Sequence, residues 1–93
     1  MKIKWDEEKN SFLKRERGIS FEEVVRNIEQ GKLLDDIKHP NSTEYPNQKI
    51  FIVELENYVY LIPYVEDTDT NEIFLKTAFP SRKMTKKYIG VKK

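Results

Sequence analysis

The sequence contains no cysteine, and His39 is its single histidine. Without cysteine there is no disulfide framework and no thiolate metal site, and one histidine cannot form a two-histidine acid–base pair. The sequence has no run of about 18 apolar residues, which excludes a membrane-spanning helix. Its first residues also lack the apolar stretch of a signal peptide. We therefore expect a cytosolic protein with no metal and no cofactor.

The chain has 93 residues, which is the size of one small domain, so we expect a single domain over residues 1–93. Apolar residues make up 38% of the sequence, which is enough for one core. Charged residues make up 35%, which is more than the ~25% of typical soluble domains. The surface is therefore expected to be densely charged.

The two signs of charge are unevenly distributed along the chain. From Lys76 onward the sequence has seven bases and no acid, whereas residues 1–75 carry ten bases and all sixteen acids. A sign split of this kind suggests that the basic end binds a polyanion or an acidic partner. A solvated basic tail is the alternative, but apolar residues such as Phe79 and Ile89 within this stretch favour a folded one.

The first third of the chain predicts one strand and two helices. Ile3 and Trp5 alternate with polar residues and indicate a strand over 2–5. Asp6 is a suitable N-cap for a helix that continues to Arg17, and Gly18 is suited to end it. Ser20-Phe21-Glu22-Glu23 is a capping box, in which the serine and the second glutamate satisfy each other's backbone amides. A second helix is therefore expected over 21–30.

The remainder predicts a loop, three strands and a short basic helix. Residues 32–48 are rich in proline and asparagine and are expected to form a loop. Period-two patterns follow, with a tight turn at Glu56-Asn57, and Pro63 indicates an edge position or a bulge. Ser81 can cap the last helix. The expected strands are 49–56, 58–65 and 72–79, and the expected helix is 82–88.

We therefore predict an α+β domain of order β-α-α-β-β-β-α, with the two N-terminal helices packed on an antiparallel sheet. If the turn at Glu56-Asn57 has two residues, both faces of the sheet are apolar. The two helices can cover one face, so we expect a partner protein to cover the other. We assign this partner surface to the face that carries Phe51, Tyr58 and Tyr60.

The two ends of the chain resemble the BrnT family of bacterial toxins. The resemblance rests on Trp5-Asp6-Glu7 and Gly18 followed by Ser20-Phe21-Glu22-Glu23, and on Arg82-Lys83-Met84-Thr85 followed by Tyr88. It covers about half of the chain. The sequence departs from the family pattern at Arg17, where the family has histidine, and at the inserted Phe79-Pro80-Ser81.

The resemblance implies a fold similar to that of the RelE and ParE toxins. It also implies a ribonuclease toxin of a type II toxin–antitoxin system, which inhibits translation by cleaving RNA without a metal. Its partner would be a DNA-binding antitoxin with a ribbon-helix-helix or helix-turn-helix domain. The alternative is a non-catalytic module of the same fold that binds nucleic acid or protein.

Cleavage by the RNA 2′-hydroxyl requires removal of its proton, stabilisation of a charged phosphorane and a proton for the leaving 5′-oxygen. We assign residues to the second and third of these. Arg82 is the best candidate for the first role because its guanidinium can hold two phosphate oxygens, and Lys76 is the second candidate. Tyr88 has a phenol that can transfer a proton or stack on a base. The predicted catalytic residues are thus Arg82, Lys76 and Tyr88, and the predicted RNA-binding residues are Lys83, Lys86 and Lys87.

Each of these residues also has a purely structural interpretation. The cations of the last helix, Arg82, Lys83, Lys86 and Lys87, can be solvated surface charges. Tyr88 can anchor this helix by packing. Tyr58 and Tyr60 can belong to the core. His39, in a loop beside Pro40, is more typical of an exposed residue than of a catalyst. Glu54 and Glu56 are two residues apart but lack the apolar surroundings that would raise one pKa for acid–base catalysis.

Overall fold

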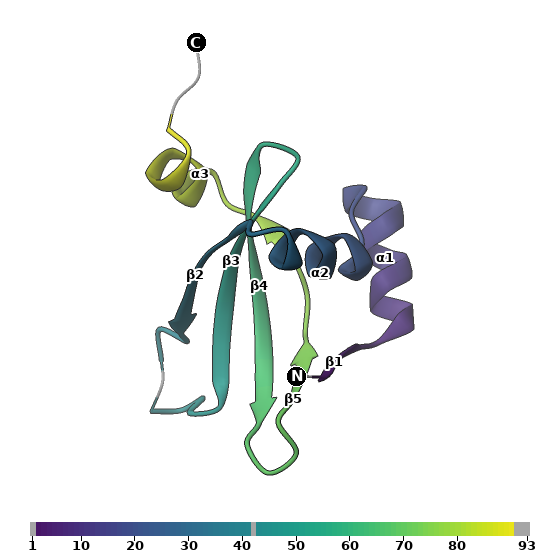
Figure 1. Ribbon diagram of the computed structural model, residues 1–93, viewed down its shortest axis with the longest axis vertical. Coiled ribbons are helices and arrows are strands. Elements are labelled where there is room, and N and C mark those ends of the chain that lie inside the picture. The colour runs from purple at the N-terminus through teal and green to yellow at the C-terminus, as the bar shows by residue number, and fades with distance from the viewer. Residues whose placement is uncertain (1, 42, 91–93) are drawn as a thin grey trace.

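The computed structural model describes residues 2–41 and 43–90 (Figure 1). This part of the chain forms an α+β domain, so the predicted fold class is confirmed. The elements, in chain order, are β1 (Lys2–Trp5), α1 (Glu7–Arg17), α2 (Phe21–Glu29), β2 (Leu33–Lys38), β3 (Gln48–Leu55), β4 (Tyr58–Asp67), β5 (Glu72–Leu75), β6 (Phe79–Pro80) and α3 (Arg82–Tyr88).

The strands form one mixed sheet of order β1-β5-β4-β3-β2, and β6 pairs with β4 beyond the end of β5. β1 runs parallel to β5, and the other pairs are antiparallel. The prediction of a purely antiparallel sheet is therefore wrong at this edge. The two helices that follow β1 allow the chain to re-enter the sheet beside β1 in the same direction, as a parallel pair requires.

The structure has two strands that the sequence did not predict. Residues 33–38, expected in a loop, form β2 and pair with β3. The single strand expected over 72–79 is interrupted at residues 76–78, which separate β5 from β6. The local pattern hid β2 because Asp35 and Asp36 stand in its middle, and aspartate is rare in strands.

Pro63 accounts for the position of this interruption. It lies on β4, which is an internal strand, so the edge position, one of the two predicted alternatives, is wrong. The Pro63 carbonyl accepts a hydrogen bond from the Lys76 N–H at 2.8 Å, so its nitrogen also points toward the gap at 76–78. Proline has no N–H to donate. The neighbouring strand is thus broken where β4 cannot supply a ladder hydrogen bond.

The turn between β3 and β4 has the two residues predicted for it. Glu56 and Asn57 have φ angles of 52° and 66°, as the two central residues of a type I′ hairpin turn require. The resulting register pairs Phe51 with Ile62 and Val53 with Tyr60. Residues therefore alternate between two faces of the sheet, which we call the front face, covered by the N-terminal helices, and the back face.

The main core lies between the front face and the helices. Figure 1 shows α2 crossing the strands, with α1 beside it near the β1 edge of the sheet. α2 buries Phe21 and Val24 against the sheet, whereas α1 contributes Leu13. The prediction that both helices pack on the sheet is therefore only partly correct, because α2 packs on the strands whereas α1 packs beside α2.

Both N-terminal helices begin at the predicted caps. The Asp6 carboxylate accepts a hydrogen bond from the Glu8 N–H at 2.9 Å. The Ser20 hydroxyl accepts one from the Glu23 N–H at 3.1 Å, and Gly18 ends α1 with a φ of 66°. These local signals were sufficient because each cap joins residues only two or three positions apart.

A pair of carboxylates connects α2 to the β3–β4 turn. Burial, a hydrogen bond with the Glu56 carboxyl group and the charge of Glu56 together raise the pKa of Glu23. A group with a raised folded-state pKa contributes stability that is fully present below its unfolded pKa. That contribution is lost as the pH rises through the folded pKa. At neutral pH the pair therefore opposes folding.

We expect Glu23→Gln to increase the free energy of unfolding at pH 7 by about 0.5 kcal/mol, the size of a like-charge pair near the surface. The gain should vanish below pH 4, and urea unfolding at both pH values measures it. Glu22→Gln is the matched control, because a hydrogen bond from Asn10 and a backbone hydrogen bond lower the pKa of Glu22. It should destabilise the protein at pH 7, and a gain from both variants would contradict this assignment.

No helix in the described residues is long and apolar enough to cross a membrane.

Candidate nucleic-acid interface

The basic helix α3 begins at the predicted cap. The Ser81 hydroxyl accepts a hydrogen bond from the Met84 N–H at 3.2 Å. The Ser81 N–H donates to the Val59 carbonyl at 2.9 Å, so the cap also extends the pairing between β6 and β4. The start of α3 is therefore fixed to the sheet.

Thr85 provides a second attachment of α3 to the same residue of β4. Its hydroxyl accepts a hydrogen bond from the Val59 N–H at 2.9 Å and donates one to the Ser81 carbonyl at 2.7 Å. Both backbone groups of Val59 are thus satisfied by the loop and helix that carry the basic residues. A helix of seven residues is too short to be stable alone, and these contacts hold it in place.

Tyr88 attaches the far end of α3 to β2. Its phenol donates a hydrogen bond to Asp35 Oδ2 at 2.9 Å, which raises the pKa of Tyr88 above its usual value. The pKa of Asp35 is lowered, first by the Asp36 N–H and then by this phenol. Since β3 lies between β2 and β4, α3 spans three strands at one end of the sheet.

The predicted RNA-binding residues are exposed on this fixed helix. Lys83 and Lys87 are four residues apart and share one face of α3, as do Arg82 and Lys86. All four cations are exposed. Within the part of the chain that the structure describes, none of them forms an ion pair. The ion pairs there are made by Lys4, Arg15 and Lys49. Lys92 and Lys93, which are also among the seven bases from Lys76 onward, lie outside the described residues.

The structure places the three predicted catalytic residues at different positions around α3. Arg82 is the first residue of the helix and Tyr88 the last, so their side chains leave the helix about 120° apart. Lys76 is exposed in the segment between β5 and β6. The phenol of Tyr88 is already bonded to Asp35, a partner that the sequence reading missed.

The predicted partner surface is wrong for Phe51. Phe51 lies on the front face, is 7% exposed and stacks on Tyr64 with ring centroids 4.0 Å apart. Tyr60 also packs against this core, and burial is the main reason that its pKa is raised. Tyr58 contacts Tyr60 edge-on, with centroids 6.2 Å apart.

The other candidates weighed from the sequence have structural roles. His39 accepts a hydrogen bond from the Asn41 N–H through Nδ1 at 3.0 Å, and its ring centroid lies 4.8 Å from that of Tyr45. Glu56 lies near Glu23, and its proximity contributes to the raised pKa of Glu23. The sequence contained no signal for that pairing, because it joins a helix to a turn.

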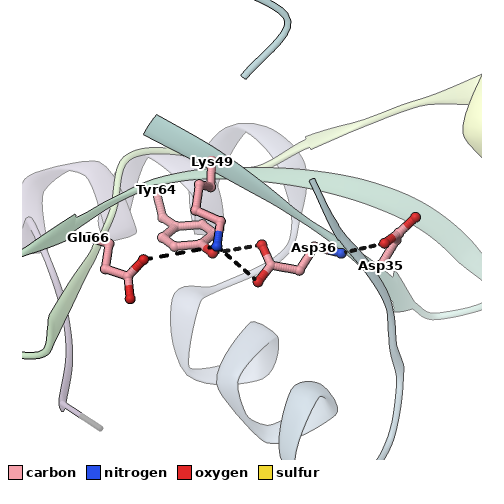
Figure 2. Close-up of polar contacts among 5 residues, drawn as sticks. All are labelled: Asp35, Asp36, Lys49, Tyr64 and Glu66. Atoms are coloured by element: carbon pink, nitrogen blue, oxygen red, sulfur yellow. Dashed lines mark hydrogen bonds and ion pairs between the residues drawn. The ribbon is translucent and has the colours of Figure 1, made fainter. Parts of the chain in front are cut away.

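A polar cluster on the front face was also missed. The Tyr64 phenol donates to Asp36 Oδ1 at 2.6 Å, and Lys49 Nζ lies 3.7 Å from Asp36 Oδ2 and 4.0 Å from Glu66 Oε1 (Figure 2). Burial and the bond to Asp36 raise the pKa of Tyr64. Figure 2 shows Asp35 pointing away from this cluster, as expected for successive residues of a strand.

The described residues contain no group of three or more histidine, aspartate or glutamate side chains able to hold a metal ion. No protein-family model matches the chain, and no match was found among the curated proteins or the solved structures. The BrnT resemblance and the ribonuclease activity therefore stay predictions.

Proposed function

We propose that this chain is a ribonuclease toxin of a bacterial type II toxin–antitoxin pair, which inhibits translation by metal-independent cleavage of RNA. The observation that supports this most directly is the set of four exposed cations on α3, a helix that Ser81, Thr85 and Tyr88 attach to the sheet by hydrogen bonds. Fixed cations suit a phosphate backbone because they need no rearrangement to meet developing negative charge.

In the proposed reaction the RNA 2′-hydroxyl gives its proton to water and its oxygen bonds to phosphorus while the P–O5′ bond breaks. The products are a 2′,3′-cyclic phosphate and a 5′-hydroxyl end. Arg82 and Lys76 stabilise the phosphorane. The Tyr88 phenol donates the proton to the leaving 5′-oxygen, which requires release of its hydrogen bond to Asp35.

A cognate antitoxin with a DNA-binding domain is the proposed protein partner, as the family resemblance implies. The second candidate function is a non-catalytic module that binds nucleic acid or protein through the same helix. It is favoured by the orientation of Arg82 and Tyr88, whose side chains leave α3 about 120° apart, and by the bond that already occupies the Tyr88 phenol.

Incubation of the purified protein with a long RNA in EDTA tests the proposal. We expect fragments that end in 2′,3′-cyclic phosphate, and we expect no cleavage of the matching DNA, which lacks the attacking 2′-hydroxyl. Salt-sensitive RNA binding alone does not distinguish the ribonuclease from the non-catalytic module, because phosphate contacts release counterions in both. Binding without any cleavage would support the non-catalytic module.

A further inference from the structure

The back face of the sheet carries an apolar band whose members range from Ile50, which is 9% exposed, to the exposed Phe74. The strand register places Ile37, Ile50 and Pro63 in one row across β2, β3 and β4. The next row contains Val65 and Phe74. Phe74 is 41% exposed, which is the largest exposure of any large hydrophobic residue in the described part. We call these two rows the apolar band.

The uncovered part of the front face has a different composition. There, Lys49 bridges Asp36 and Glu66 above the buried Tyr64 (Figure 2). An antiparallel sheet that faces water normally carries polar residues of this kind on its solvated face. The back face carries isoleucine, proline, valine and phenylalanine, flanked by the Lys4–Glu72 ion pair beside Phe74 and by Gln48 beside Val65. An apolar group with a polar rim is typical of an interaction surface.

The helix α3 borders this band and has a strong charge of one sign. It is hydrogen-bonded to the backbone of Val59 on β4 and to the side chain of Asp35 on β2. On the back face, Val59 and Ile52 are buried in this region. Its four cations form no ion pair within the described residues. A partner that lies on the apolar band next to α3 would therefore meet one of the two pairs of cations on this helix.

The dimensions favour a single helix as the occupant of the band. Its two rows are about 7 Å apart, and a helix with its side chains is about 10 Å wide. Neighbouring helices pack about 8–10 Å apart, so a helix on the band would run alongside α3. A second copy of the sheet fits less well, because α3 stands above the back face at one end.

We infer that the apolar band binds an amphipathic helix of a partner protein, with acidic residues along the edge that faces α3. Its apolar side covers Ile37, Pro63 and Phe74, and its carboxylates pair with cations of α3. The inference does not depend on RNA cleavage. Where the proposed function holds, the partner and RNA compete for the same cations, so the bound helix also excludes RNA.

The probe is a designed helical peptide of about 18 residues, long enough to fold, with leucine on one face and glutamate along both flanks. The same peptide with lysine for glutamate is its charge control. We expect the acidic peptide to bind about tenfold more tightly than the basic one, with an affinity that falls as salt increases. Phe74→Glu should weaken this binding by at least about tenfold.

Leu33→Glu is the matched protein control, because Leu33 is 36% exposed and belongs to the front face through its pairing with Val53. It should leave peptide binding unchanged. Equal loss in both variants, equal binding of both peptides, or no binding up to about 1 mM would overturn the inference. Self-association of the protein that Phe74→Glu abolishes would also overturn it in favour of a second copy. RNA cleavage by Phe74→Glu is measured in parallel, so failure of this inference is distinguishable from failure of the proposed function.

Discussion

Arg82→Ala is expected to abolish growth inhibition on expression in bacteria and to lower RNA cleavage by a factor of about 10²–10³. This is the cost of losing one preorganised group that stabilises transition-state charge. Arg82 is exposed at the start of α3 and takes part in none of the core contacts. The variant should therefore fold normally, and thermal unfolding monitored by circular dichroism should coincide with that of the wild type.

Two further variants separate the guanidinium geometry from charge alone. Arg82→Lys should recover only part of the activity, because an ammonium group keeps the charge but loses the two-point contact. Lys87→Ala should weaken RNA binding modestly and reduce the slope of log affinity against log salt by roughly one unit. Full toxicity of Arg82→Ala at wild-type expression would leave the site assignment without support and favour the non-catalytic module.

Asn10→Leu is expected to lower the free energy of unfolding by about 2–4 kcal/mol. Asn10 is fully buried, and its side chain joins α1 to the start of α2. Oδ1 accepts a hydrogen bond from the Phe21 N–H at 2.8 Å, and Nδ2 donates to Glu22 Oε1 at 2.8 Å. Leucine has the same branching and the same number of side-chain heavy atoms but leaves the buried Phe21 N–H without a partner. Urea denaturation provides the measurement.

Asn10→Asp tests the same contact through its pH dependence. Aspartate keeps an acceptor for the Phe21 N–H but places a second carboxylate against Glu22, which raises the pKa of the pair. The loss of stability should therefore be large at pH 7 and diminish toward pH 4, where one of the two groups is protonated. Ser11→Ala, at the exposed neighbouring position, should stay within about 0.5 kcal/mol of the wild type. A similarly small change in Asn10→Leu would show that the contact is unimportant.

The sequence by itself determined the features that depend on near neighbours. The caps at Asp6, Ser20 and Ser81, the glycine that ends α1 and the Glu56-Asn57 turn are all found where the sequence predicted them. Each is specified by hydrogen bonds or φ angles within two to four residues. Those interactions are the same in any tertiary context.

Tertiary structure decided which strands pair and which face of the sheet the helices cover. Both faces of β3 and β4 are apolar, so the period of two gave the alternation but not the choice of face. Phe51 was consequently assigned to the open surface although it is buried. β2 and the β1–β5 pair were not predictable in the same way, because strand pairing joins segments distant in the sequence.

The candidate site shows the same division. The basic character and cap of α3 were evident from the sequence, since charge and capping are local properties. The bonds from Thr85 to Val59 and from Tyr88 to Asp35 were not, because they join residues 26 and 53 positions apart. These distant contacts set the direction in which each cation of α3 points. Only the folded chain places the cations beside the apolar band of the back face.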